Sequence, residues 1–247
     1  MAGRSDREQD RPRDPAAGLA LLWGEQGRPT RGPKPRLSPQ RIAAAAAELA
    51  DAEGLDAVSM SRVAGGFGVS AMALYRYVPG KTELVALMVE SVLAEAPDLS
   101  RVPEGDWRAA VREWTRCCAR VYADHPWLLG ATAMRRQLMG PCQLSWLDAA
   151  LAALEPTGLG AAQRHQVFLL LIGLVRNLAQ QLGDHDEEGS EEWDRLSAEL
   201  LARHADRFPA LARAVAEGAF EPDGTDALAF GLDRILDGVE ALMTGRE

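Results

Sequence analysis

The stretch "SMSRVAGGFGVSAMALYRYVPGK", residues 59–81, predicts two short helices separated by a glycine-containing turn. Ser59 is a favourable N-cap for a helix over residues 60–67, and Gly68 breaks that helix. Ser70 is placed to cap a second helix over residues 71–77. Two short helices joined in this way have the layout of a helix-turn-helix, which fits the major groove of B-DNA.

The second of these helices is amphipathic. Leu74 and Val78 share a face that can pack inward, and the opposite side carries small, aromatic and basic residues. Tyrosine hydroxyls and cationic side chains bind phosphate oxygens, and small residues allow a close approach to the groove. The groove-facing candidates are Ala71, Met72, Tyr75, Arg76, Tyr77 and Lys81. Periodicity alone leaves open a surface helix pair with a solvated charged face, in which Tyr75 belongs to the core.

Upstream of this stretch, the pattern predicts one longer helix and a basic arm. Ser38 and Pro39 begin the helix, and Gly54 ends it. Residues 1–36 are expected to form a flexible arm, because prolines and glycines interrupt its basic part. Its apolar island at residues 19–24 has no assigned role. Four cations of the arm are expected near phosphates or the minor groove: Arg28, Arg31, Lys34 and Arg36.

Charge is divided unevenly along the 247 residues. Residues 1–81 carry 12 Lys and Arg against 9 Asp and Glu, a net +3, whereas the remainder carries 15 against 27, a net −12. A large acidic body repels DNA, which argues against a plain architectural DNA-binding protein and favours a separate regulatory domain. The longest apolar run has nine residues, too few to span a bilayer. We therefore expect a cytoplasmic protein with no membrane partner.

The remainder of the chain is predicted to be helical. A helix starting near Lys81 is expected to run towards Pro97 and to join the two halves. A further helix is expected within the stretch 106–126, and others near residues 127–139, 142–154, 161–183, 190–206, 208–217 and 225–244. The resulting fold class is all-α, with an N-terminal three-helix helix-turn-helix domain and a larger C-terminal helical domain. The expected boundaries are 1–36 for the arm, 37–82 for the DNA-binding domain and 83–247 for the regulatory domain.

No enzymatic motif is visible. The sequence lacks a P-loop, a G-x-S-x-G elbow, H-E-x-x-H and any Glu-x-x-His pair, so we expect neither an enzyme nor a cofactor. The three cysteines form no C-x-x-C pair and are interpreted as reduced structural thiols. The run "DHDEE" at 184–188 favours a solvated loop over a metal site around His185, and no metal is expected.

The stretch from Ser59 to Leu84 resembles the DNA-binding signature of the tetracycline repressor (TetR) family. That pattern runs from a capping hydroxyl through A-x-x-L-G-V-S to L-Y-x-H/Y-F/V-x-x-K. The resemblance implies that Ser59 and Ser70 cap helices next to phosphates, and that Lys81 meets a phosphate. It also implies base contacts for Ala71 and Met72, and backbone or base contacts for both tyrosines. Because Ala71 and Met72 cannot make bidentate base contacts, Arg62 and the arm gain importance.

The C-terminal half is similar to the regulatory domain of the same family in "HPWLL" at 125–129 and "FGLDRILDGVEAL" at 230–242. The resemblance implies a homodimer formed through the helices near 161–183 and 225–244. Both helices carry broad apolar surfaces, which could also be buried within one monomer. The residues on these surfaces are Val167, Leu170, Leu171 and Leu174, and Leu228, Leu232, Ile235, Leu236 and Val239.

A small-molecule pocket is expected among aromatic and amide side chains of the C-terminal half, which combine apolar walls with a few polar groups. The candidates are Trp114, Trp127, Met134, Trp146, Asn177 and Gln181. Each of these residues could instead belong to the core. Arg176 is interpreted either as a partner for an acidic ligand or as half of an ion pair.

Together these features predict a homodimeric TetR-type transcriptional regulator, a repressor in function. It is expected to bind double-stranded operator DNA and to be released by an unidentified small-molecule effector. The alternative is a helix-turn-helix regulator without such an effector.

Overall fold

The structure, a computed structural model, describes residues 15–24, 37–133, 138–183, 187–220, 224 and 226–245. All regular structure in these ranges is helical, so the all-α prediction is confirmed. The α-helices are α2 (Pro15–Leu22), α3 (Pro39–Glu53), α4 (Met60–Gly66), α5 (Ala71–Tyr75), α6 (Lys81–Val92), α7 (Trp107–Asp124), α8 (Leu128–Ala131), α9 (Pro141–Ala153), α10 (Ala161–Gly183), α11 (Glu187–Arg203), α12 (Pro209–Ala216) and α13 (Ala227–Thr244). Short 3-10 turns are η1 (Leu55–Ala57), η2 (Glu155–Thr157) and η3 (Ala205–Arg207).

Local sequence signals set the ends of α3, α4 and α5. The hydroxyl of Ser38 accepts the Arg41 N–H at 3.2 Å, and the hydroxyl of Ser59 accepts the Arg62 N–H at 3.2 Å. Ser70 precedes α5, but its side chain makes no capping hydrogen bond. Gly68, with φ +66°, forms the turn between α4 and α5, a conformation that favours glycine. The predicted helix-turn-helix is therefore present.

A small apolar core holds the helix-turn-helix together. Ile42 of α3, Val63 of α4 and Leu74 of α5 are almost completely buried, and Leu84 and Met88 of α6 complete the core. Helix α6 also packs along α3. The helix that begins at Lys81 is thus a structural part of the DNA-binding unit.

Helix α6 is tied to α9 of the C-terminal half. The buried Glu90 carboxylate accepts the backbone N–H groups of Cys142 at 2.8 Å and Gln143 at 3.0 Å, which are otherwise unpaired at a helix start. The Trp146 indole N–H donates to the Leu93 carbonyl at 3.1 Å. A Cβ atom at Gly140 would lie 2.3 Å from the Glu90 carboxyl carbon, so the two elements meet closely there.

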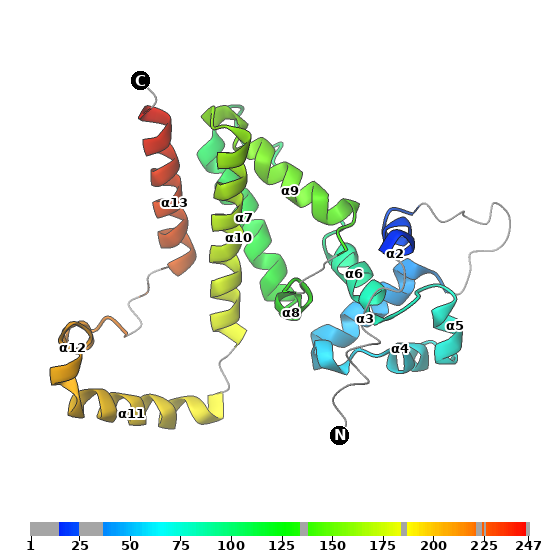
Figure 1. The fold of residues 1–247 in the computed structure, drawn as a ribbon, viewed down its shortest axis with the longest axis horizontal. Coiled ribbons are helices and arrows are strands. Elements are labelled where there is room, and N and C mark those ends of the chain that lie inside the picture. Colours follow the sequence, from blue (N-terminus) through cyan, green and yellow to red (C-terminus); the bar gives the residue numbers. More distant parts are fainter. Residues whose placement is uncertain are drawn as a thin grey trace.

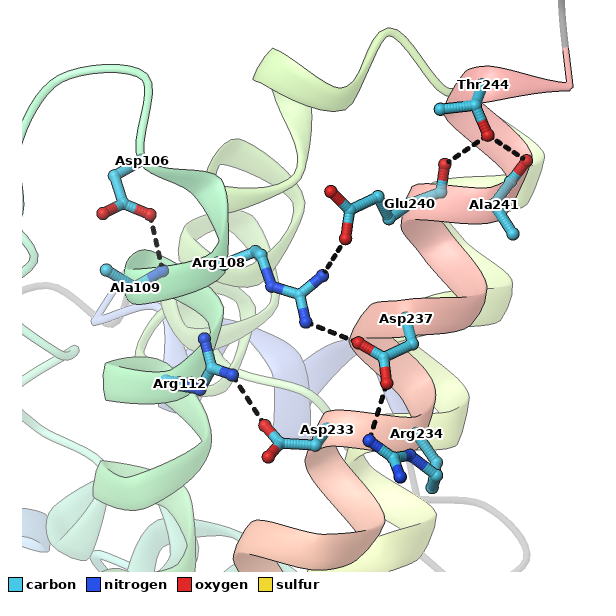
Figure 2. Close-up of polar contacts among 10 residues, drawn as sticks. All are labelled: Asp106, Arg108, Ala109, Arg112, Asp233, Arg234, Asp237, Glu240, Ala241 and Thr244. Atoms are coloured by element: carbon cyan, nitrogen blue, oxygen red, sulfur yellow. Dashed lines mark hydrogen bonds and ion pairs between the residues drawn. The ribbon is translucent and has the colours of Figure 1, made fainter.

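The C-terminal half is organised around α10, which packs against both α7 and α13 (Figure 1). Helices α11 and α12 extend away from this body in the same view. A ladder of ion pairs joins α7 to α13 (Figure 2). Arg108 contacts Asp237 at 2.7 Å and Glu240 at 2.6 Å, and Arg112 contacts Asp233 at 2.6 Å.

Part of the segment expected to be a flexible arm is folded. The apolar island contributes to α2, which packs against α6, and Leu21 and Leu22 are buried. A Cβ atom on Gly18 would lie 2.9 Å from a methyl carbon of Leu138, so α2 also lies close to the segment before α9.

One expected helix is much shorter than predicted. Of residues 127–139, only Leu128–Ala131 form a helix, and residues 134–137 lie outside the described part of the chain. The hydroxyl of Thr132, the C-cap of α8, donates to the carbonyl of Leu128, the first residue of α8, at 2.6 Å.

Candidate DNA-binding surface and ligand pocket

The outward face of α5 carries exposed residues. Met72 is 72% exposed and Tyr75 is 46% exposed, and Arg76 at the end of the helix is also exposed. Ala71 is half-buried beside them. Because Leu74 is fully buried on the opposite side, α5 presents Met72, Tyr75 and Arg76 to solvent with a fixed orientation.

The other predicted contact residues are less exposed. Tyr77 is half-buried and packs against the core, so its ring supports α5 as well as facing the surface. Lys81 begins α6 and is also half-buried, as is Ser59, whereas Ser70 is exposed at the start of α5. The four arm cations Arg28, Arg31, Lys34 and Arg36 lie outside the described residues.

Arg62 is paired within the protein. Its guanidinium makes two hydrogen bonds to the Glu53 carboxylate, at 2.9 and 2.6 Å, a bidentate arrangement between α4 and the end of α3. Hydrogen bonding to Arg62 lowers the pKa of Glu53 below its ordinary range. Arg62 can reach a DNA phosphate only by sharing or leaving this partner.

A pocket of about 510 Å³ lies between α7, α10 and the start of α13. Its walls are mainly apolar, with polar groups from Tyr122, Gln181 and Asp226. The apolar lining residues are Ala119, Ala123, Pro126, Val175, Leu178, Ala179, Ala227 and Leu228. A pocket of this size and lining suits a small, predominantly apolar molecule.

Three of the predicted ligand residues are core tryptophans. Trp114, Trp127 and Trp146 are each no more than 7% exposed, and none of them lines the pocket. The indole N–H of Trp114 donates to the Trp146 carbonyl at 2.9 Å, and that of Trp127 donates to Asp51 at 2.6 Å. The indole N–H of Trp146 donates to the Leu93 carbonyl at 3.1 Å.

Of the remaining predicted ligand residues, only Gln181 lines the pocket. Asn177 is exposed, and Met134 lies outside the described residues. The sequence signal that was missed is the spacing of Ala119 and Ala123, which share one face of α7. Their small side chains leave a cavity where larger residues would fill the core.

Arg176 forms no ion pair with a carboxylate among the described residues, and it is not among the residues that line the pocket. It donates to the Tyr122 hydroxyl at 3.2 Å, to the Thr132 hydroxyl and to the Leu129 carbonyl at 3.1 Å. All of these acceptors are neutral, and the guanidinium also lies over the Tyr122 ring. Arg176 therefore connects α10 to α7 and α8.

The cysteines are free thiols, and their surroundings do not favour reactivity. Burial raises the pKa of Cys118 to about 12, and burial together with the nearby Glu90 raises that of Cys142 to about 11. No metal-binding cluster occurs among the described residues, and His185 lies outside them. Every helix in the described ranges is too short or too polar to cross a bilayer.

Comparison with known proteins places both halves of the chain in one family. Residues 42–88 match the N-terminal domain of "Bacterial regulatory proteins, tetR family", and residues 99–243 match "Tetracyclin repressor-like, C-terminal domain". The HTH-type transcriptional repressor DrrR1 of Streptomyces coeruleorubidus is 38% identical over 242 residues, covering 94% of this chain and 88% of the relative. An HTH-type transcriptional regulator of Saccharopolyspora erythraea is 33% identical, covering 78% of this chain and 79% of the relative.

Solved structures agree with the sequence relatives. The Streptomyces coelicolor TetR family protein ActR in complex with actinorhodin superposes with a TM-score of 0.72 at 28% identity, covering 83% of this chain and 96% of ActR. Apo ActR gives a TM-score of 0.74 at 26% identity, covering 87% of this chain and all of ActR. The likeness therefore extends over the DNA-binding and regulatory halves together.

Proposed function

Because the chain belongs to the tetR family of bacterial regulatory proteins, we propose that it is a homodimeric transcriptional repressor controlled by a small molecule. The observation that carries the proposal is the pairing of an exposed helix in a helix-turn-helix with an apolar pocket in the same chain. The exposed helix binds operator DNA, and the pocket binds an effector.

The operator-binding surface consists of α5, with Tyr75 and Arg76 projecting from it, and of Lys81 at the start of α6. Met72 offers apolar contact to a base edge, such as a thymine methyl group, and Tyr75 and Arg76 reach base edges or phosphates. Polar base-reading side chains are few on α5, so phosphate contacts and DNA shape supply much of the discrimination.

The effector is a small, predominantly apolar molecule that occupies the pocket between α7, α10 and α13. Among the described lining residues there is no lysine, arginine or histidine, and the carboxylate of Asp226 is present. These residues offer no positive charge to an anionic effector, so a neutral or cationic effector is favoured. The related ActR has been solved in complex with actinorhodin.

Dimerisation through α10 and α13 is supported by apolar residues that the monomer leaves exposed. Leu170 is 58% exposed on α10 and Phe230 is 59% exposed on α13. Gly173 and Gly238 have open space around them, which lets another helix approach closely. Several residues expected at this surface are instead buried in the monomer: Val167, Leu171, Leu232, Leu236 and Val239.

Binding-site selection from a random duplex library tests the proposal. The purified protein should enrich a palindromic sequence whose half-sites match two recognition helices one helical turn, about 34 to 36 Å, or a multiple of it, apart. Arg76→Ala should weaken binding to the selected duplex, whereas Glu48→Ala, on the exposed face of α3, serves as the matched surface control. Failure to enrich any sequence would refute the assignment as a specific DNA-binding regulator.

The effector is tested separately, by thermal-shift screening of neutral and cationic apolar compounds followed by titration with and without the selected duplex. Coupling must be reciprocal, so a compound that weakens DNA binding a hundredfold must lose a hundredfold of its own affinity when DNA is bound. Equal compound affinity in both titrations would exclude control of DNA release by that compound.

A further inference from the structure

The turn between α7 and α8 lies between the pocket and the DNA-binding unit. It consists of His125, Pro126 and Trp127, and Pro126 is one of the lining residues of the pocket. The residues on both sides of Pro126 contact α3, the first helix of the DNA-binding unit. One short turn therefore contacts both the candidate pocket and the first helix of the DNA-binding unit.

The contact with α3 is made by two ring N–H groups and one carboxylate oxygen. Asp51 Oδ1 lies 2.8 Å from His125 Nδ1 and 2.6 Å from Trp127 Nε1. Both nitrogens donate to this oxygen, and a charged acceptor makes such bonds stronger than neutral ones. Trp127 is 6% exposed, so its ring is fixed in the core while its N–H points at α3.

Helix α8, which follows the turn directly, is held from the pocket side by α10. Arg176 follows the lining residue Val175, and it donates to the Leu129 carbonyl of α8 and to the hydroxyl of Thr132, the C-cap of α8. Nearby, Leu55 of η1 lies 3.4 Å from the position that a Cβ atom on Gly130 would take. A shift of α10 relative to α7 therefore reaches α8 directly and the turn through α8.

We propose that the turn His125–Trp127 couples the occupancy of the pocket to the position of the DNA-binding unit, helices α3 to α6. Asp51 is the positioning residue on that unit. This inference rests on the proposed function, because it names how the pocket is coupled to DNA. An occupant of the pocket displaces Pro126, and the two donors beside it then move Asp51 and the C-terminal end of α3.

The second connection between the halves, from α6 to α9, lacks this access to the pocket. Glu90 and Trp146 join α6 to α9 firmly, but no residue of α6 or α9 lines the pocket. We infer that this connection holds the two halves together, whereas the turn responds to what the pocket contains.

The test needs no known effector, because a large side chain can occupy the pocket in its place. Ala179→Trp fills part of the pocket from α10, and Ala123→Trp provides a second, independent filling from α7. Each substitution is expected to change the affinity for the selected duplex by about tenfold, which is within the usual range of allosteric coupling and corresponds to about 1.4 kcal/mol.

The response is then measured with the contact to α3 removed. Each filling substitution is combined with Asp51→Ala or with Trp127→Phe, which keeps an aromatic ring but loses the N–H donor. In these combined variants the filling should change DNA affinity by less than about twofold. Trp146→Phe is the matched control, since Trp146 is as buried as Trp127 and donates to the Leu93 carbonyl of the other connection. In the Trp146→Phe variant, the filling should change DNA affinity as much as it does in the otherwise unchanged protein.

Three results separate the hypotheses. A full response that persists in both Asp51→Ala and Trp127→Phe overturns the role of the turn and leaves the proposed repressor function intact. A response that is lost equally in Trp146→Phe also overturns it, since the route would not be specific. If neither filling changes DNA affinity in the otherwise unchanged protein, control by the pocket and transmission by the turn both fail. Thermal unfolding of every variant confirms that the protein is folded.

Discussion

At the scale of single residues, the two tyrosines of the recognition region have different structural roles. Tyr75 is exposed on α5, whereas Tyr77 packs against the core. Tyr75→Ala should therefore weaken DNA binding by about two- to tenfold, the equivalent of one lost contact, with an unchanged melting temperature. Tyr77→Ala should lower both DNA affinity and stability. Equal melting temperatures for the two variants, measured by circular dichroism, would contradict this distinction.

Gly140 lies where α6 and α9 meet. In Gly140→Ala the new methyl group would occupy the space of the Glu90 carboxylate and displace it from the N–H groups of Cys142 and Gln143. Overpacking and loss of these bonds should cost about 1–3 kcal/mol of unfolding free energy. Urea denaturation measures the loss. Gly160→Ala, where a Cβ atom would lie 3.8 Å from Gln163 Oε1, an ordinary contact distance, is the control and should not destabilise the fold.

At the scale of elements, α4 is weakened by its own sequence. Gly65 lies within this helix and a Cβ atom there would meet nothing within 4 Å, so Gly65→Ala should stabilise the protein by about 0.5–1 kcal/mol. Gly68→Ala is the opposite case. Its φ of +66° is unfavourable for alanine, and we expect a loss of about 1 kcal/mol or more. Chemical denaturation that moved both variants in one direction would refute this explanation.

The ion pairs between α7 and α13 make part of the stability depend on pH (Figure 2). Hydrogen bonding to Arg108 lowers the pKa of Asp237 in the folded protein. A lowered folded-state pKa stabilises the fold at neutral pH, and this contribution disappears as the pH falls through that pKa.

Asp237→Asn should therefore be less stable than the unsubstituted protein at pH 7, and the difference should vanish in acid below the ordinary pKa range of an aspartate. Because Asp237 is exposed, 1 M salt should also reduce the difference. Melting temperatures measured across pH and salt test both expectations. A difference that stays constant with pH would exclude the ion pair as its cause.

The sequence predicted helices better than it predicted the pocket. N-caps such as Ser38 and Ser59 act within three residues, so their effect is readable along the chain. Whether a tryptophan faces a cavity or a packed core depends on residues far away in sequence: Trp127 is satisfied by Asp51, 76 positions earlier. The pocket lining includes four alanines, Ala119, Ala123, Ala179 and Ala227, and alanines carry no distinctive pattern. Periodicity shows which face is buried, not what covers it.

At the scale of the whole molecule, the basic segment can be tested without disturbing the fold. Deleting residues 1–36 would also remove α2, whose Leu21 and Leu22 are buried. Replacing the four cations of the segment by alanine avoids this problem. The proposed dimer carries two copies of the segment, so if all eight cations neutralise phosphates, the slope of log K against log salt should become less negative by about 7.2. Fluorescence anisotropy at several salt concentrations measures the slope, and an unchanged slope would show that these cations do not contact DNA.

The packing of α2 against α6 has a further consequence for the entropy of DNA binding. The basic segment at 25–36 begins where α2 has ended and finishes where α3 starts, so both of its ends are attached to folded parts of the chain. Fixing both ends of a segment reduces the number of conformations open to it. Here this conformational entropy is lost when the protein folds, before DNA binds. A segment that is attached at both ends loses less conformational freedom when it is ordered on a duplex than a segment with one free end.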